Sequence, residues 1–250
     1  DTTFSISYED IAGNAGANMT QDNSSTNIIR IDTGLPELEF VNIASNNPDN
    51  STAMAGDQVT LSVHSKEALS TLNMVKSDGS LRPLNPDSSK TLWTRVKTIE
   101  EGDTGLLEIR LSFSDLVGNA GIEVTQTTDQ SSVEMDTTLP EILNENITST
   151  NDDPNWARYG DNVTLSFSTS EAIQDPTDNI TIEGLINIVV VESDNKSEWT
   201  VTGQVASDAT GMANYSISVM DLTGNVANPV TSSTSIKLDT DPPSLSDVVL

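Results

Sequence analysis

The segment GDQVTLSVHSKEAL, residues 56–69, returns as GDNVTLSFSTSEAI at residues 160–173, an offset of 104 residues. In the first copy apolar and polar side chains alternate, so that Val59, Leu61 and Val63 share one face. A two-residue period is typical of a β-strand with one buried face. A repeat near 104 residues has the size of a whole domain and is far longer than a solenoid unit. The segment therefore predicts one β-strand that recurs in two similar domains.

Three further features repeat at nearly the same distance. An acidic, glycine-containing loop, written DIAGNAG, DLVGNAG and DLTGNVA, starts at Asp10, Asp115 and Asp221. A segment of the form DTxxP starts at Asp32, Asp136 and Asp239. Trp93 lies 106 residues before Trp199. Because independent markers share one offset, the repeat predicts duplicated domains.

The local pattern is β throughout, since no stretch keeps a 3.6-residue apolar period. Short strands separated by turn residues, about seven per hundred residues, are typical of an immunoglobulin-type sandwich. For residues 34–137 the expected strands are A near 37–45, B near 58–65, C near 70–77, E near 91–99, F near 106–114 and G near 122–136, with G broken by TTDQSS. The second domain is expected to follow at about +104. The predicted fold class is all-β, with tandem immunoglobulin-like antiparallel β-sandwiches in a linear array.

The same alternation predicts which side chains are buried. Leu107, Ile109, Leu111 and Phe113 share the inner face of the expected strand F, and Phe4, Ile6 and Tyr8 have that role in the first segment. Trp93 and Trp199 are expected between the sheets, whereas Trp156 has no counterpart in the first domain.

Domain limits placed at the DTxxP segments divide the chain into four parts. They are 1–33, the C-terminal part of one immunoglobulin-like domain; 34–137 and 138–240, two complete domains; and 241–250, the first strand of a following domain. The sequence thus predicts a stretch of a longer tandem array.

The chain is strongly acidic, with 38 acidic and 11 basic residues and a net charge of −27. Nucleic acids and anionic membrane surfaces would repel such a chain. There is no cysteine, and therefore neither a disulfide framework nor a thiolate metal site. No apolar run is long enough to span a membrane, so direct membrane insertion is not expected.

Enzyme activity is not expected. His64 is the single histidine, and its alternation puts it on the outer face of a strand. Without a second histidine or a cysteine, Ser-His-Asp and Cys-His sites are not predicted. Acids that recur in every domain, at the ends of the sandwiches, favour an architectural role over a glycosidase pair.

The immunoglobulin topology predicts where the recurring acids meet. The B–C and F–G loops gather at the end of a domain where its first strand begins, beside the preceding DTxxP linker. The linker should therefore approach the acidic loop of the following domain and the A–B and E–F loops of the preceding one. Clustered carboxylates and amides are the oxygen ligands that Ca²⁺ prefers. The candidate ligands are Asp32, Glu67, Asp115, Asn119, Asp103, Asp136, Glu171, Asp221, Asn225 and Asp239.

A simpler reading of these residues stays open. Aspartate and asparagine are common turn formers, and a proline-containing linker is stiff without any metal. The sequence contains no EF-hand motif, which would by itself identify a calcium site.

The segments SDLVGNAGIEVT and VEMDTTLPEI, followed by GDNVTLSFSTSEAI, resemble the bacterial immunoglobulin-like repeats of very large cell-surface adhesins. The resemblance covers essentially the whole chain. It implies an extracellular stalk of tandem sandwiches whose junctions Ca²⁺ holds rigid, as in cadherins. It supports Asp32, Asp115, Asp136, Asp221 and Asp239 as ligands. Gly34 and Asp241 depart from the pattern, at the position where Thr138 stands in DTT.

The expected partners are neighbouring domains of the same chain, and other copies if the chain forms a filament. Two other functions fit the sequence. One is a set of accessory carbohydrate-binding sandwiches of a secreted enzyme, and the other is a filament subunit completed by a strand of another copy.

Overall fold

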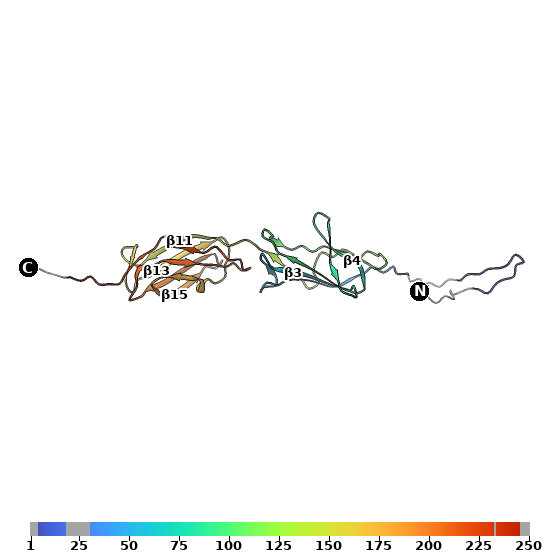
Figure 1. Ribbon diagram of the computed structural model, residues 1–250, viewed down its shortest axis with the longest axis horizontal. Coiled ribbons are helices and arrows are strands. Elements are labelled where there is room, and N and C mark those ends of the chain that lie inside the picture. Colours follow the sequence, from blue (N-terminus) through green and yellow to red (C-terminus); the bar gives the residue numbers. More distant parts are fainter. Residues whose placement is uncertain (1–4, 19–30, 233, 246–250) are drawn as a thin grey trace, which may run out of the picture. The chain divides into compact units, whose positions relative to one another are not determined.

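A computed structural model describes residues 5–18, 31–232 and 234–245. These residues form β-strands and connecting loops, with one short 3-10 turn, η1 (Thr177–Asn179). The fold is all-β, with antiparallel sheets arranged as tandem immunoglobulin-like sandwiches, as the sequence predicts (Figure 1). Within the described residues, no helix is long and apolar enough to cross a membrane.

The contacts within the chain divide it into two compact units. The first comprises Asp1–Ile43, Thr60–Val96 and Glu108–Ser131, and the second comprises Ala44–Val59, Lys97–Leu107 and Ser132–Leu250. The domain limits expected from the repeat, 34–137 and 138–240, stay predictions. The expected outer parts, 1–33 and 241–250, fall partly outside the described residues.

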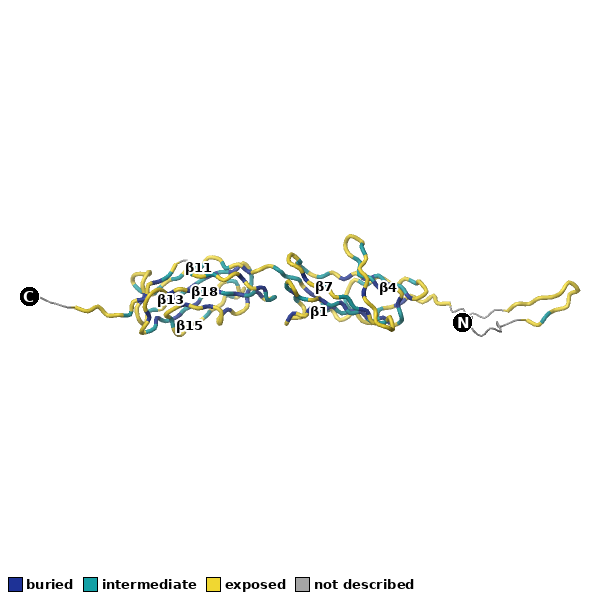
Figure 2. Tube along the Cα trace, in the orientation of Figure 1, coloured by how far each residue is buried: buried dark blue, intermediate teal, exposed yellow. Residues whose placement is uncertain are grey.

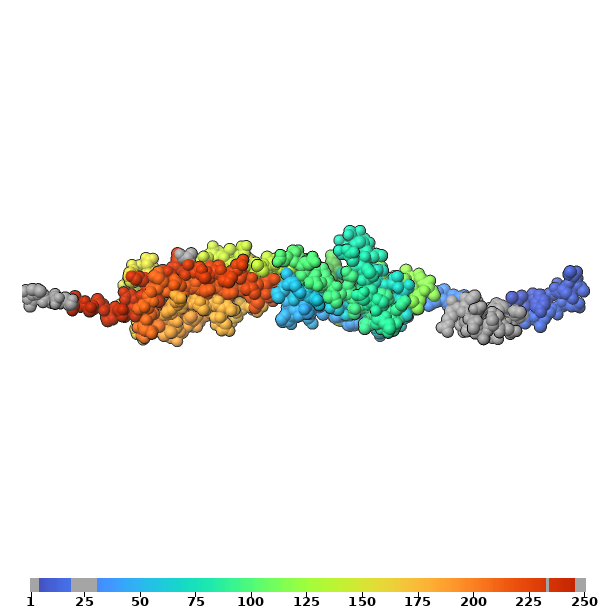
Figure 3. Space-filling model, in the orientation of Figure 1, coloured from blue at the N-terminus to red at the C-terminus, as the bar shows by residue number. Residues whose placement is uncertain are grey.

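Ten strands form the first repeat. They are β1 (Leu38–Ser45), β2 (Thr52–Ala53), β3 (Gln58–Ser65), β4 (Leu69–Val75), β5 (Leu81–Pro83), β6 (Asn85–Pro86), β7 (Leu92–Thr98), β8 (Gly105–Leu106), β9 (Leu111–Asp115) and β10 (Glu134–Met135). One sheet has the order β1-β3-β7-β6, a second β5-β4-β9 and a third β2-β10-β8. The turn between β4 and β5 projects from the surface of this repeat (Figure 3).

The second repeat also has one four-stranded and two three-stranded sheets. Its strands are β11 (Ile142–Ser149), β12 (Trp156–Ala157), β13 (Asn162–Thr169), β14 (Ile180–Ile182), β15 (Leu185–Glu192), β16 (Glu198–Val205), β17 (Thr210–Met212), β18 (Tyr215–Ile217), β19 (Val230–Thr231) and β20 (Lys237–Asp239). The sheet orders are β11-β13-β16-β15, β14-β18-β19 and β12-β20-β17. In both repeats a two-residue strand pairs in parallel with the last strand, β2 with β10 and β12 with β20.

Alternation builds the core of each repeat as predicted. Along β3, Val59, Leu61 and Val63 are buried, and along β13 the buried residues are Val163, Leu165 and Phe167. The tube in Figure 2 shows this alternation of buried and more exposed positions along the strands. In strand F of the first repeat, Ile109, Leu111 and Phe113 are buried, whereas Leu107 is only half-buried.

Both predicted core tryptophans are buried, and each is anchored by the same hydrogen bond. The indole N–H of Trp93 donates to the carbonyl of Lys90 at 2.9 Å, and that of Trp199 donates to Lys196 at 3.2 Å. Each lysine has a positive φ, 59° and 54°, which turns its carbonyl toward the ring. The preceding turn is therefore repeated along with the tryptophan.

Strand C of the second repeat departs from the +104 rule. The rule places it near 174–181, but β14 begins at Ile180. The segment before it forms η1, because Pro176 has no N–H for a sheet and Asp175 accepts the N–H of Thr177 at 2.9 Å.

Strand G of the first repeat also differs from its prediction. In place of one strand over 122–136, there is a bridge between Leu111 and Val124 and the short β10. The polar segment between them turns toward β1, where Thr128 and Val41 exchange hydrogen bonds.

The predicted core face of the first segment is not buried. Ile6 and Tyr8 are 52% and 59% exposed, and Phe4 lies outside the described residues. Within residues 5–18 an isolated bridge joins Glu9 to Ala15. The expected burial of this face is therefore not found for Ile6 and Tyr8.

Candidate metal sites

The three acidic loops have one geometry, set by an aspartate at the first position and an asparagine at the fifth. Oδ1 of Asp115 accepts the backbone N–H groups of Val117, Gly118 and Asn119 at 2.9, 2.7 and 2.8 Å. Its Oδ2 accepts from the amide of Asn119 at 2.7 Å. Gly118 has φ of +100°, a region that favours glycine. The motif is therefore a turn built around one carboxylate.

The loop at Asp221 repeats this arrangement. Oδ1 of Asp221 accepts the N–H groups of Thr223, Gly224 and Asn225 at 2.8, 2.6 and 2.9 Å. The amide of Asn225 donates to Oδ2 at 2.8 Å. Asp10 and Asn14 are joined in the same way, at 2.8 Å.

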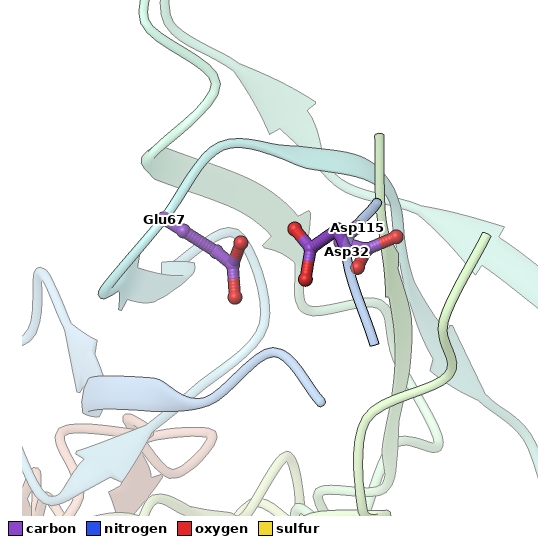
Figure 4. A group of neighbouring side chains, drawn as sticks. All are labelled: Asp32, Glu67 and Asp115. Carbon is purple, nitrogen blue, oxygen red and sulfur yellow. The ribbon is translucent and has the colours of Figure 1, made fainter. Parts of the chain in front are cut away.

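In the first repeat this loop lies against the preceding DTxxP segment. The second amide hydrogen of Asn119 goes to the carbonyl of Asp32 at 3.2 Å. Asp32, Glu67 and Asp115 each offer a carboxylate oxygen, and these three oxygens lie within 4.8 Å of one another. Figure 4 shows the side chain of Glu67 extending toward Asp115 and Asp32. Asp115 is 1% exposed, while Asp32 is exposed.

The second repeat forms an equivalent group from Asp136, Glu171 and Asp221, again within 4.8 Å. Asn225 donates to the carbonyl of Asp136 at 3.0 Å. Here Asp221 is buried and the other two carboxylates are half-buried. Asp115 thus lies with Asp32 and not with Asp136, although Asp136 is nearer in sequence, and this is the pairing that the topology predicts.

The carboxylates of these groups have unequal proton affinities. Burial opposes ionisation of Asp115, but hydrogen bonds from the Asn119 amide and from three backbone N–H groups outweigh it and lower its pKa. The pKa of Glu171 is raised, first by burial and then by the negative charges of Asp136 and Asp221. In the second group, therefore, Glu171 is the carboxylate whose ionisation is opposed by burial and by its charged neighbours.

Six of the ten candidate ligands form these two groups, Asn119 and Asn225 lie beside them, and Asp103 and Asp239 belong to neither. The carboxylate of Asp103 pairs with Lys97 and accepts the N–H of Glu100 at 3.0 Å, and these bonds lower its pKa. Asp239 ends β20 and accepts the N–H of Asp241 at 3.2 Å. Among the described residues the three-carboxylate groups include neither of them, and their role as ligands stays a prediction.

The chemistry of both groups fits a hard divalent cation. Each supplies three carboxylates. Beside them lies an asparagine that donates its amide hydrogens to the buried aspartate and to the backbone carbonyl of the linker aspartate. Ca²⁺ takes roughly six to eight oxygen ligands, so water or further carbonyls would complete the shell. A cation there would also remove the repulsion that raises the pKa of Glu171.

Asp57 and Asp161 have a role that sequence reasoning did not assign. Each accepts a side-chain amide hydrogen at 2.8 Å, from Asn47 and Asn151, and a backbone N–H at 2.9 Å, from Met54 and Arg158. They stabilise the connection between β1 and β3 in the first repeat and between β11 and β13 in the second. The signal was the repeated GDxVT, in which the aspartate recurs with the strand.

No family model matches the chain, and no curated protein matches it. Among solved structures it is similar to a tandem pair of titin Ig domains, with 13% identity and a TM-score of 0.28. That match covers 82% of this chain and 97% of the titin chain.

Proposed function

We propose that the chain is a non-enzymatic stalk segment of a large, repetitive extracellular adhesin or filament, and that Ca²⁺ stiffens its joints. One observation carries the proposal. The same Asp-Glu-Asp group, beside the same asparagine, occurs in each repeat at the end where its first strand begins. A turn-shaping role explains the buried aspartate of each loop. It does not explain why linker and B–C carboxylates approach that aspartate against their mutual repulsion.

The proposed mechanism ties the linker to the sandwich that follows it. Asp32 and Asp136 belong to DTxxP segments, whereas the other two acids of each group belong to the sandwich itself. Without a cation the three negative charges favour separation of the linker from the sandwich. With Ca²⁺ bound the same charges attract the ion, and the linker loses its freedom to rotate.

A carbohydrate-binding role has less support. Trp156 is 37% exposed, but the ammonium of Lys237 lies 4.2 Å from its ring centroid and covers one face of the indole. Cation–π contacts of this kind stabilise a side chain in place and compete with sugar stacking. We therefore do not extend the proposal to sugars.

Calorimetry and small-angle scattering test the proposal together. Titration of the chelator-treated chain with Ca²⁺ should show binding that the double variants Asp32→Asn/Asp115→Asn and Asp136→Asn/Asp221→Asn each reduce. The maximum dimension should increase and the flexibility should fall when Ca²⁺ is added. In the second double variant this change should be lost at the joint around Asp136 only.

Glu108→Gln/Asp194→Asn is the matched control, because it removes the same number of charges at two exposed positions outside both groups. It should bind Ca²⁺ like the unchanged chain. Absence of Ca²⁺ binding would disprove the metal sites, and binding with unchanged scattering would disprove the stiffening.

A further inference from the structure

Strand β15 ends its sheet with one side of its backbone unpaired within the described chain. The order β11-β13-β16-β15 makes it the last of four strands, and it lies at the rim of the second repeat (Figure 1). Its sequence LINIVVVE is rich in β-branched residues. Ile186, Ile188, Val189 and Val191 are 46%, 38%, 57% and 57% exposed. Exposed apolar edges of this length are sites where another strand can add.

Two edge strands of the first repeat contain proline, and one of them, β6, has the position of β15. Its sheet β1-β3-β7-β6 ends in β6, which contains Pro86, and the sheet β5-β4-β9 ends in β5, which contains Pro83. Proline has no N–H to offer a new strand, and its place at edges prevents association. β15 contains neither proline nor lysine. One chain thus blocks these edges in one repeat and leaves the equivalent edge open in the other.

We propose that β15 pairs antiparallel with β15 of a second copy of this chain. Asn187 has φ of +54° and lies in the register shift between Ile186 and Val189, so the regular part of the edge begins after it. If a two-fold axis passes through Val190, the regular parts of the two β15 strands pair with each other. This axis places Val189 of one copy opposite Val191 of the other, and both residues belong to the exposed face.

The register centred on Val190 keeps the acidic residues of the two copies from lying opposite each other. In the register centred on Val190, Glu192 of one copy lies opposite Ile188 of the other, and Ser193 lies opposite Asn187. Asp194 lies opposite Ile186. No carboxylate opposes another carboxylate, and like charges directly opposite each other would be destabilising. The strand is therefore complementary to itself.

The association should be weak and should respond to salt in a characteristic direction. A five-residue strand pair buries less than the roughly 1,000 Å² of a stable interface. We therefore expect a dissociation constant of about 0.1 mM, which is typical of weak association. The net charge of −27 on each copy opposes pairing, so added salt should strengthen it. Binding of a basic peptide to this acidic chain would respond to salt in the opposite direction.

Sedimentation velocity of the whole chain in chelator tests the inference, at up to about 1 mM protein and about 0.02 to 0.5 M salt. A dimer should appear with rising concentration and salt. Val189→Lys/Val191→Lys should remain monomeric, since both positions are exposed and each lysine adds repulsion to an apolar pair. Leu81→Lys/Leu106→Lys is the matched control, with residues 53% and 61% exposed in the first repeat, and should dimerise normally.

Cysteine cross-linking tests the register, because the chain has no cysteine of its own. An equimolar mixture of the single variants Val189→Cys and Val191→Cys should oxidise to a mixed dimer faster than either variant alone. A chain that stays monomeric, a dimer that weakens with salt, or one that the β15 variant leaves intact would overturn the inference. The proposed stalk and its Ca²⁺ sites would be unaffected by that failure.

Discussion

At the scale of single residues, the last position of each seven-residue acidic loop is glycine where an aromatic ring contacts it and alanine where the contacting residue is smaller. A Cβ added to Gly121 would lie 2.1 Å from the ring of Phe113, and one added to Gly16 would lie 2.3 Å from Tyr8. In the third copy of the loop the residue is Ala227, and Val219 has the position of Phe113 and Tyr8. A backbone hydrogen bond joins each pair. The N–H of Gly121 donates to the carbonyl of Phe113 at 3.0 Å, and that of Ala227 donates to Val219 at 2.9 Å. Glycine is thus required here by an aromatic neighbour.

Gly121→Ala should destabilise the first repeat by about 1–3 kcal/mol, the usual cost of overpacking a filled site. Phe113→Val creates a cavity, and Phe113→Val/Gly121→Ala reproduces the pair found in the second repeat. The double variant should be less destabilised than the sum of the single changes, by roughly 0.5–3 kcal/mol of coupling. Urea unfolding of the four chains gives this coupling, and additive effects would show that the contact is not the reason for the glycine.

At the scale of elements, strands with one buried face were predictable and the shortest pairings were not. The predicted range 58–65 matches β3, because eight alternating residues carry a clear period. β2 and β10 have two residues each, too few for any period, and are defined by their pairing, β2 in parallel with β10 and β10 antiparallel with β8. The segment 126–131 has no apolar pattern either. Its place beside β1 depends on polar side chains that sequence alone does not connect.

The polar contacts that hold segment 126–131 beside β1 should depend on pH. Hydrogen bonds from Ser131 and Asn42 lower the pKa of Asp129 to about 2, from an ordinary 3.8. A carboxylate with a lowered pKa stabilises the fold above its ordinary pKa, and this contribution is lost as the pH falls from about 4 to about 2. Asp129→Ala should therefore lower the unfolding free energy at pH 7 and have a much smaller effect near pH 2. A difference that stays constant over this range would mean that ionisation of Asp129 does not hold the segment.

At the scale of the whole molecule, the topology was enough to bring the acids of each candidate site together. Asp32, Glu67 and Asp115 come from three separate segments, and an immunoglobulin plan places those segments at one end of a domain. Asp103 was harder to place, because its pairing with Lys97 depends on one local turn. The unequal pKa values could not be predicted, since they follow from burial and from distances between carboxylates.

The charge of the whole chain makes Ca²⁺ and simple salt distinguishable as stabilisers. Sodium chloride screens the −27 charge everywhere, whereas Ca²⁺ adds stability by mass action only where it binds the folded state. At 100 times its dissociation constant, one bound ion contributes about 2.7 kcal/mol, or very roughly 5–10 °C in a chain of this size. Thermal unfolding at fixed ionic strength should therefore show a large rise with Ca²⁺ and little with Na⁺. Asp221→Asn should reduce this rise in the second repeat and leave it in the first, and an equal response to both salts would show that screening alone accounts for the effect.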